Sequence, residues 1–136
     1  MTMLGELLFP PAANRRTAAS LLLWWESRRM VYNGIVGFTG LFTLIVIRLI
    51  AFVPPGVPMP IDWRPIVAYG ALANVCYTFG WGIESVAQRI WGDKCPTIGP
   101  ALFRQGVAFS VGLTLLPILL VSIAWVARVA AFFLSL

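Results

Sequence analysis

The sequence contains no histidine, and this absence removes several kinds of chemistry. Histidine is the commonest transition-metal ligand in proteins and the commonest axial ligand of haem or chlorophyll. The two cysteines of the chain, Cys76 and Cys95, are too far apart in the sequence to form a metal or redox motif. We expect both to be free thiols. The chain also lacks a glycine-rich phosphate loop and any nucleophile with an evident base. We therefore expect no catalytic residue, no metal ligand and no directly bound cofactor, and we predict that the protein is not an enzyme.

Charged residues are also scarce. They make up 11% of the 136 residues, whereas hydrophobic residues make up 60%. Soluble domains usually carry about 25% charged residues. A chain of this length has no room for a soluble domain beside a membrane domain. The composition thus predicts a single integral membrane domain that covers residues 1–136.

Three long apolar runs account for most of the chain, at about residues 33–53, 66–86 and 106–126. About 20 residues of α-helix cross the roughly 30 Å hydrocarbon core of a bilayer. Each run is long enough, so the expected fold is all-α with three transmembrane helices. The proline-rich stretch VPPGVPMPIDWRP connects the first two runs, and GDKCPTIGP connects the last two.

The segment before the first run has a different pattern. Residues 17–30, TAASLLLWWESRRM, contain no glycine or proline and are too few to cross a bilayer. Within the interfacial segment 1–30 we therefore expect an N-terminal interfacial amphipathic helix that leads into the first span. Pro10 and Pro11 would separate it from the short apolar start of the chain.

The basic residues predict an orientation. Seven of the ten lie before the first span or between the second and third: Arg15, Arg16, Arg28, Arg29, Arg89, Lys94 and Arg104. The other three, Arg48, Arg64 and Arg128, lie on the opposite side. Because cytoplasmic loops carry the excess of Lys and Arg, we expect the bacterial inner membrane, a cytoplasmic N-terminus and an outer C-terminus. These residues flank spans, so the net charge of +5 does not indicate nucleic-acid binding.

Small residues recur on the first span at Gly34, Gly37 and Gly40. Small residues let the backbones of neighbouring membrane helices approach closely. We interpret the three glycines as a helix-packing face, mostly within the chain, although glycine is also common in membrane helices for no such reason.

The second span carries most of the polar side chains. A single helical stripe is expected for Asn74, Tyr77, Trp81, Glu84 and Gln88, which are spaced alternately by three and four residues. An ionisable residue inside a membrane faces the protein interior and needs a partner. For Glu84 we expect an ion pair with Arg28 or Arg29 of the antiparallel first span, with Tyr32 and Asn33 donating nearby.

Three interpretations of this intramembrane polar network remain open. It fixes how the first two spans dock, it forms a proton- or cation-coupled transport site on Glu84, or it contacts a partner subunit. A Glu84→Gln variant separates the first two. Loss of ion-dependent flux with unchanged assembly favours transport, whereas loss of stable protein favours structure.

Three stretches together resemble a family of small uncharacterised bacterial membrane proteins: WWESRRMVYNGIVGFTG, NVCYTFGWGIE and FSVGLTLLP. Its members share a Trp/Arg-rich lead-in ending in Tyr-Asn, a central N-x-x-Y-x-x-G-x-x-x-E stretch and a late apolar span with proline. The similarity covers Trp24 to Val126, without the proline-rich connection or the first 14 residues. It implies a multi-pass membrane architecture and brings no activity, substrate or cofactor.

Two main functions follow as hypotheses. The first is an accessory structural subunit of a multi-subunit bacterial membrane complex, such as an energy-transducing or photosynthetic one, with other membrane subunits and lipids as partners. The alternative is a small homo-oligomeric transporter or channel that uses Glu84. A third, weaker reading is a contribution to a lipid or quinone site at the aromatic and arginine-rich rim.

Overall fold

The computed structural model describes residues 17–56, 60, 62–92 and 98–135. Three helices make up nearly all of them: α2 (Ala18–Phe52), α3 (Trp63–Trp91) and α4 (Gly99–Leu134). The expectation of an all-α fold with three helices long and apolar enough to cross a membrane is confirmed for this part of the chain. The protein is thus membrane-embedded. α3 and α4 extend past the predicted spans at both ends, and α2 extends past its span only at the N-terminal end.

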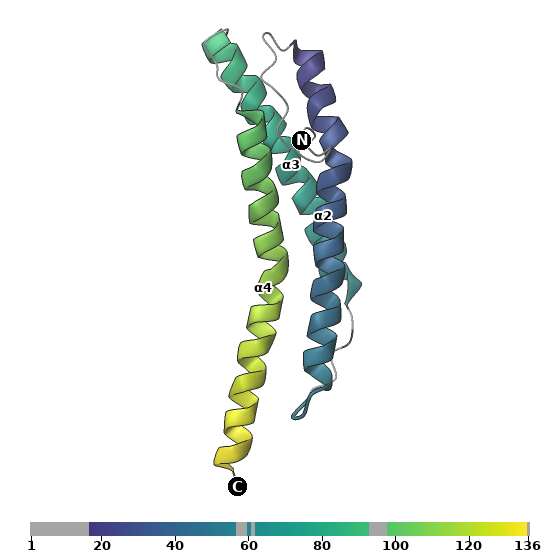
Figure 1. Ribbon diagram of the computed structural model, residues 1–136, viewed down its shortest axis with the longest axis vertical. Coiled ribbons are helices and arrows are strands. Elements are labelled where there is room, and N and C mark those ends of the chain that lie inside the picture. Colours follow the sequence, from purple (N-terminus) through teal and green to yellow (C-terminus); the bar gives the residue numbers. More distant parts are fainter. Residues whose placement is uncertain (1–16, 57–59, 61, 93–97, 136) are drawn as a thin grey trace, which may run out of the picture.

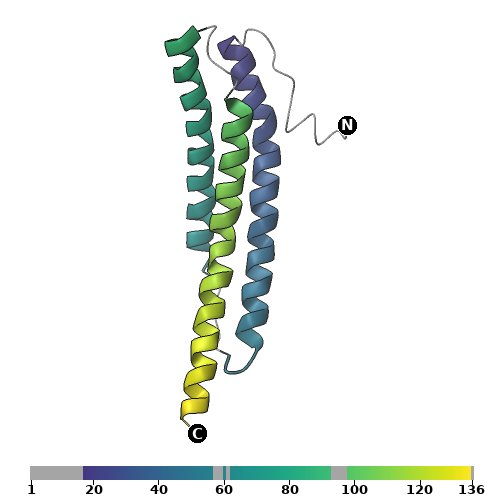
Figure 2. The same ribbon diagram turned by 60° about the vertical axis from the view of Figure 1, so that its left-hand side comes forward.

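The helices form an elongated antiparallel bundle (Figures 1 and 2). α2 packs mainly on α4, and α3 lies against both with fewer contacts. α2 and α4 contain 35 and 36 residues, which corresponds to lengths of about 52–54 Å. The C-terminal part of α4 extends beyond the end of α2 (Figure 2).

The segment 18–30 does not form a separate interfacial helix, because it is the first part of α2. Thr17 caps this helix, with its hydroxyl accepting the backbone N–H of Ser20 at 3.2 Å. No proline interrupts the chain between this cap and Val53, so the helix continues from the polar segment into the apolar one. Leu21 and Trp25 are buried in the bundle and do not lie on a surface. Residues 1–16 of the expected interfacial segment lie outside the described residues.

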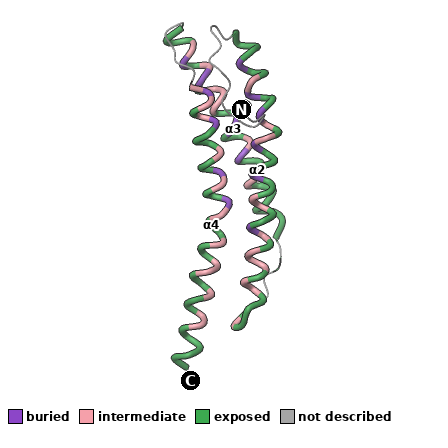
Figure 3. Tube along the Cα trace, viewed as in Figure 1, coloured by how far each residue is buried: buried purple, intermediate pink, exposed green. Residues whose placement is uncertain are grey.

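The core occupies only one half of the bundle (Figure 3). Every buried residue that the structure describes lies within residues 21–43 of α2, 73–87 of α3 or 99–114 of α4. The remaining parts of α2 and α4, residues 44–52 and 115–134, are half-buried or exposed along their whole length. We call residues 21–43, 73–87 and 99–114 the packed half, and residues 44–52 and 115–134 the open half.

Candidate functional site: a buried carboxylate and aromatic cluster

The most unusual group of the packed half is the carboxylate of Glu84, which is 0% exposed. Its Oε2 accepts the indole N–H of Trp25 on α2 at 2.7 Å. Its Oε1 accepts the backbone N–H of Gly99 on α4 at 3.2 Å. These two bonds are not its only interactions. One side chain of α3 is therefore hydrogen-bonded to both other helices.

The bond to Gly99 has a second role at the start of α4. The first N–H groups of any helix lack partners within the helix and are usually capped by a side chain. Ile98 stands at the N-cap of α4 and provides no side-chain hydrogen bond. Glu84 supplies the acceptor from another helix, at a position where an anionic side chain also interacts favourably with the helix dipole.

Two glycines make room for this arrangement. A Cβ at Gly99 would lie 2.8 Å from Oε1 of Glu84, and a Cβ at Gly80 would lie 2.7 Å from the Cη2 atom of Trp25. Real Cβ atoms almost never come that close to another atom. Both positions thus require glycine because of close approach between helices, not because of backbone conformation.

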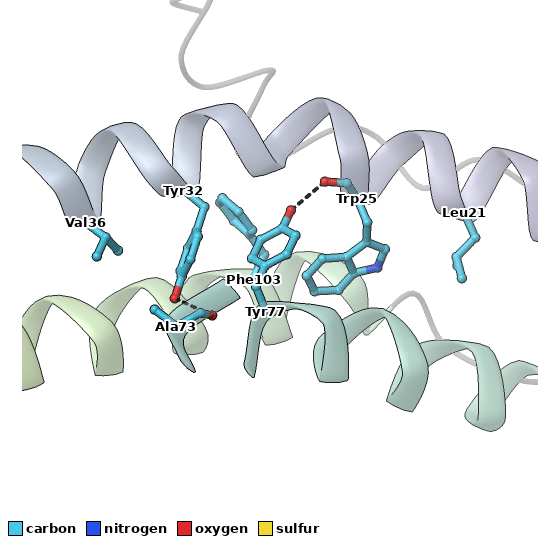
Figure 4. Packing of buried hydrophobic residues seen from close by; sticks show 7 residues of the cluster. All are labelled: Leu21, Trp25, Tyr32, Val36, Ala73, Tyr77 and Phe103. Carbon is cyan, nitrogen blue, oxygen red and sulfur yellow. Dashed lines mark hydrogen bonds between the residues drawn. The ribbon is translucent and has the colours of Figure 1, made fainter. Parts of the chain in front are cut away.

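Four aromatic rings, one of them the Trp25 indole that bonds to the carboxylate, pack against one another (Figure 4). The Trp25 ring meets Tyr77 edge to face, with centroids 5.2 Å apart, and Phe103 lies 6.3 Å from Tyr77. Tyr32 completes the group at 4.7 Å from Tyr77. The hydroxyl of Tyr77 donates to the backbone carbonyl of Trp25. Such pairs add about 0.5–1.5 kcal/mol each beyond their burial in measured cases.

A second set of polar contacts lies farther along the bundle from Glu84, around Ser110 and Thr114 of α4. The hydroxyl of Tyr32 donates to the carbonyl of Ala73 at 3.2 Å and lies 2.8 Å from Oγ of Ser110. The hydroxyl of Tyr69 lies 2.7 Å from Oγ1 of Thr114 and 2.9 Å from the carbonyl of Ser110.

The hydroxyl protons of this set determine each other, because each hydroxyl has only one to donate. If Tyr32 donates to Ala73, Ser110 must donate to Tyr32. The Thr43 hydroxyl of α2 donates to the Thr114 carbonyl at 3.0 Å. These bonds join all three helices a second time. Each of these hydroxyl groups is hydrogen-bonded to another hydroxyl or to a backbone carbonyl of the bundle.

The predicted polar network is only partly assembled. Tyr77 and Glu84 lie together in the core. Arg29 pairs with Glu26 of its own helix at 2.8 Å, and neither it nor Arg28 is among the described partners of Glu84. The indole of Trp25 takes that place, since it reaches the carboxylate from the inward face of α2.

The described contacts of the other predicted members lie away from the carboxylate. Arg28 is buried, with its guanidinium 4.0 Å from the centroid of the Trp24 ring and its Nη1 donating to the Trp24 carbonyl at 3.2 Å. Asn33 is exposed, and Asn74 donates to the carbonyl of Gly70 in its own helix at 3.0 Å. The last two side chains therefore do not link helices within the described chain.

The three glycines predicted as a packing face also separate. Gly40 approaches α4, because a Cβ there would lie 3.8 Å from Cγ2 of Thr114. Gly34 and Gly37 are exposed, and a Cβ at either would meet nothing within 4 Å. The close helix contacts of the chain are at Gly80 and Gly99 instead.

A small hollow of about 80 Å³ lies between α3 and α4 beside the aromatic cluster. Its walls include the rings of Tyr32, Tyr77 and Phe103, and Cys76 is exposed at its edge. Within the described residues, no group of three or more Cys, Asp or Glu side chains could hold a metal ion.

Comparison with protein-family models, curated proteins and solved structures gives no match to this chain. The geometry of the packed half is therefore the basis for a functional proposal.

Proposed function

We propose that the chain is an accessory structural subunit of a multi-subunit bacterial inner-membrane complex, with its N-terminus in the cytoplasm. The observation that carries this proposal is the use of Glu84. Both oxygens of its fully buried carboxylate bind other helices of the same chain. An intramembrane carboxylate used in this way supports a fixed architecture more than an exchangeable ion site.

The remaining polar contacts support the same proposal. The inter-helix hydroxyl contacts described in the packed half end at Thr43 and Thr114. Beyond them, residues 44–52 and 115–134 contain no buried side chain that could line a passage. Ion pathways are usually lined by carbonyl groups or charged side chains at their selective sites. The geometry therefore gives the transporter alternative less support.

The surface supports a role among membrane neighbours. Large apolar side chains are exposed on all three helices, including Phe38, Phe79 and Phe109 at 74%, 65% and 71%. In a membrane, such surfaces contact lipids or the helices of other subunits. The excess of basic residues in the stretches 15–29 and 89–104 supports the cytoplasmic side for the end of the bundle where α2 and α4 begin.

Extraction from native membranes in a mild detergent, followed by native mass spectrometry, tests the proposal. We expect the chain in a complex with larger and different membrane subunits. Detection of a self-oligomer alone, with ion flux after reconstitution that Glu84→Gln abolishes, would contradict the structural role and favour the transporter. Loss of folded protein in Glu84→Gln, without any flux in the parent chain, agrees with the proposal.

A further inference from the structure

The contact between α3 and α4 is held by polar bonds at two separate levels. Glu84 and Gly99 form the first, at the start of α4. Tyr69 forms the second with Ser110 and Thr114. Fifteen residues, or about 22 Å of helix, separate Tyr69 from Glu84 on α3. These are the two levels at which described side chains hydrogen-bond across this contact.

The 80 Å³ hollow lies between these two levels. α3 contributes Cys76 and Gly80 to its wall, and α4 contributes Gly106 and Phe109. Gly106 and Phe109 are exposed, as is Cys76, so the hollow lies next to the outer surface of the bundle. The gap between α3 and α4 here is bordered by the bonds above and below, and by Tyr32 of α2, whose hydroxyl contacts both Ala73 and Ser110.

The Glu84 bonds depend on charge. An ionised carboxylate only accepts hydrogen bonds, so it suits two N–H donors that come from different helices. A protonated carboxyl group carries an O–H donor on one oxygen. That oxygen is then a weaker acceptor, so the bond from Trp25 or from Gly99 would be weakened. The favourable interaction between a negative charge and the start of α4 would be lost as well.

We propose that Glu84 is a charge-dependent latch, whose loss of charge frees the first turn of α4 from α3 and widens the hollow toward the bilayer. The Tyr69 level contains only hydroxyl and carbonyl groups and keeps the helices together at its own depth. The change is therefore a local separation at one end of α4.

Other charged groups lie near Glu84. Any change on acidification must be distinguished from an effect of these groups. Those of the described helices near this end are Arg28 and the Glu26–Arg29 pair on α2, Arg89 on α3 and Arg104 on α4. Arg28 shares the inward face of α2 with Trp25, whereas Arg89 and Arg104 are exposed. Asp93 and Lys94 belong to the connection outside the described residues. Glu26 and Glu84 are the carboxylates among these described groups, and Glu26 is on the surface.

Distance measurements between spin labels in the full-length chain test this inference. Cys76→Ser and Cys95→Ser remove the native thiols before reconstitution into lipid nanodiscs. An inner label pair at the exposed positions Val86 and Arg104 reports the latch, and an outer pair at Val67 and Leu116 reports the Tyr69 level. Each pair is measured at neutral and at mildly acidic pH, with Glu84 and with Glu84→Gln.

The expected result is a longer inner distance in Glu84→Gln at neutral pH and in the parent chain at acidic pH, with the outer distance unchanged. Tyr69→Phe is the matched control and should lengthen the outer distance alone. Equal changes in both pairs would show general loosening and overturn the latch, as would an unchanged inner distance. If Glu84→Gln does not fold, the parent chain decides: a reversible acid-induced inner shift supports the latch, and a constant distance refutes it.

The inference concerns the same carboxylate as the proposed structural function, but the two fail separately. The distances are measured in the isolated chain, so the absence of partner subunits would leave the latch intact. A constant inner distance would leave the subunit role intact.

Discussion

At the scale of single residues, Glu84 determines how the three helices meet. A buried carboxylate is costly unless its oxygens are bonded, and here an indole and a backbone amide from two other helices supply the donors. The arrangement also needs a flat indole at Trp25 and the absence of a side chain at Gly80 and Gly99. These four residues therefore form one unit, and changes in any of them affect the same contact.

Removal of the indole N–H tests this unit. Trp25→Phe keeps an aromatic ring but leaves Oε2 of Glu84 without this donor. Loss of one partner of a buried polar group costs about 1–3 kcal/mol, and more for a charged one. We expect a loss of that size in unfolding by SDS in mixed micelles. Trp63→Phe is the control, because Trp63 is 64% exposed and its change should have little effect. Equal stability of the two variants would contradict the contact.

The glycines provide a second test with controls in the same chain. Gly80→Ala and Gly99→Ala each place a Cβ against a buried side chain, and overpacking of this kind typically costs about 1–3 kcal/mol. Gly34→Ala and Gly37→Ala place a Cβ in open space, so the isolated chain should keep its stability or gain slightly. Thermal unfolding in detergent distinguishes the pairs, and a reversed order would refute the packing.

The polar stripe could be predicted from the sequence only approximately. Spacing indicated Asn74, Tyr77, Trp81, Glu84 and Gln88, whereas the inward face of α3 follows Ala73, Tyr77, Gly80, Glu84 and Ala87. Polarity alone would place Asn74 and Trp81 on the inward face. Close packing between helices instead favours the small neighbouring residues at that face. The seven-residue recurrence of Ala73, Gly80 and Ala87 was a visible signal for this face. The indole partner of Glu84 was not visible, because arginine is the more obvious partner of a carboxylate.

At the scale of helices, hydropathy located the spans but not the ends. The apolar runs predicted about 21 residues each, and the helices contain 29 to 36. Hydropathy reports where the chain becomes polar, whereas a helix continues until a cap, glycine or proline ends it. α3 begins directly after its N-cap Asp62, whose side chain accepts the Arg64 N–H at 3.0 Å, and ends before Gly92 with φ of 52°. The N-terminal part of α2 was misread for the same reason.

The second polar level on α4 should respond to loss of a single hydroxyl. Tyr69→Phe removes the contacts to Ser110 and Thr114 while it keeps the ring. We expect a loss of about 1 kcal/mol, since a typical internal hydrogen bond contributes about 0.5–1.5 kcal/mol. Thr39→Val is the control, because its hydroxyl bonds only to Ile35 of its own helix. SDS titration of both variants checks this, and a larger loss for Thr39→Val would be inconsistent with the assignment.

At the scale of the whole molecule, the bundle is asymmetric along its length. The packed half contains every buried residue of the described chain, and the open half of α2 and α4 contains none. The basic residues at 28, 29, 89 and 104 lie toward the packed end. If the orientation follows the basic residues, the rigid end of the protein faces the cytoplasm.

Reporter fusions check this orientation. Alkaline phosphatase is active only outside the cytoplasm, so a fusion at the C-terminus is expected to be active. A fusion after Trp91, between α3 and α4, is expected to be inactive and serves as the matched control. The reverse pattern would place the packed half on the outer side and refute the topology.

The split into a packed and an open half also makes the mechanical response of the bundle directional. Local stability follows the density of buried contacts, so the free energy of opening rises along α4 from its C-terminal end toward Gly99. A force applied at the C-terminal end would first detach residues 115–134, against half-buried and exposed side chains and the bond from the Trp125 indole to the Val53 carbonyl. It would reach the carboxylate and the aromatic rings last. The same force applied at the start of α4 would load the Glu84 contact and the aromatic rings at once, so we expect the two ends of α4 to separate from the bundle at different forces.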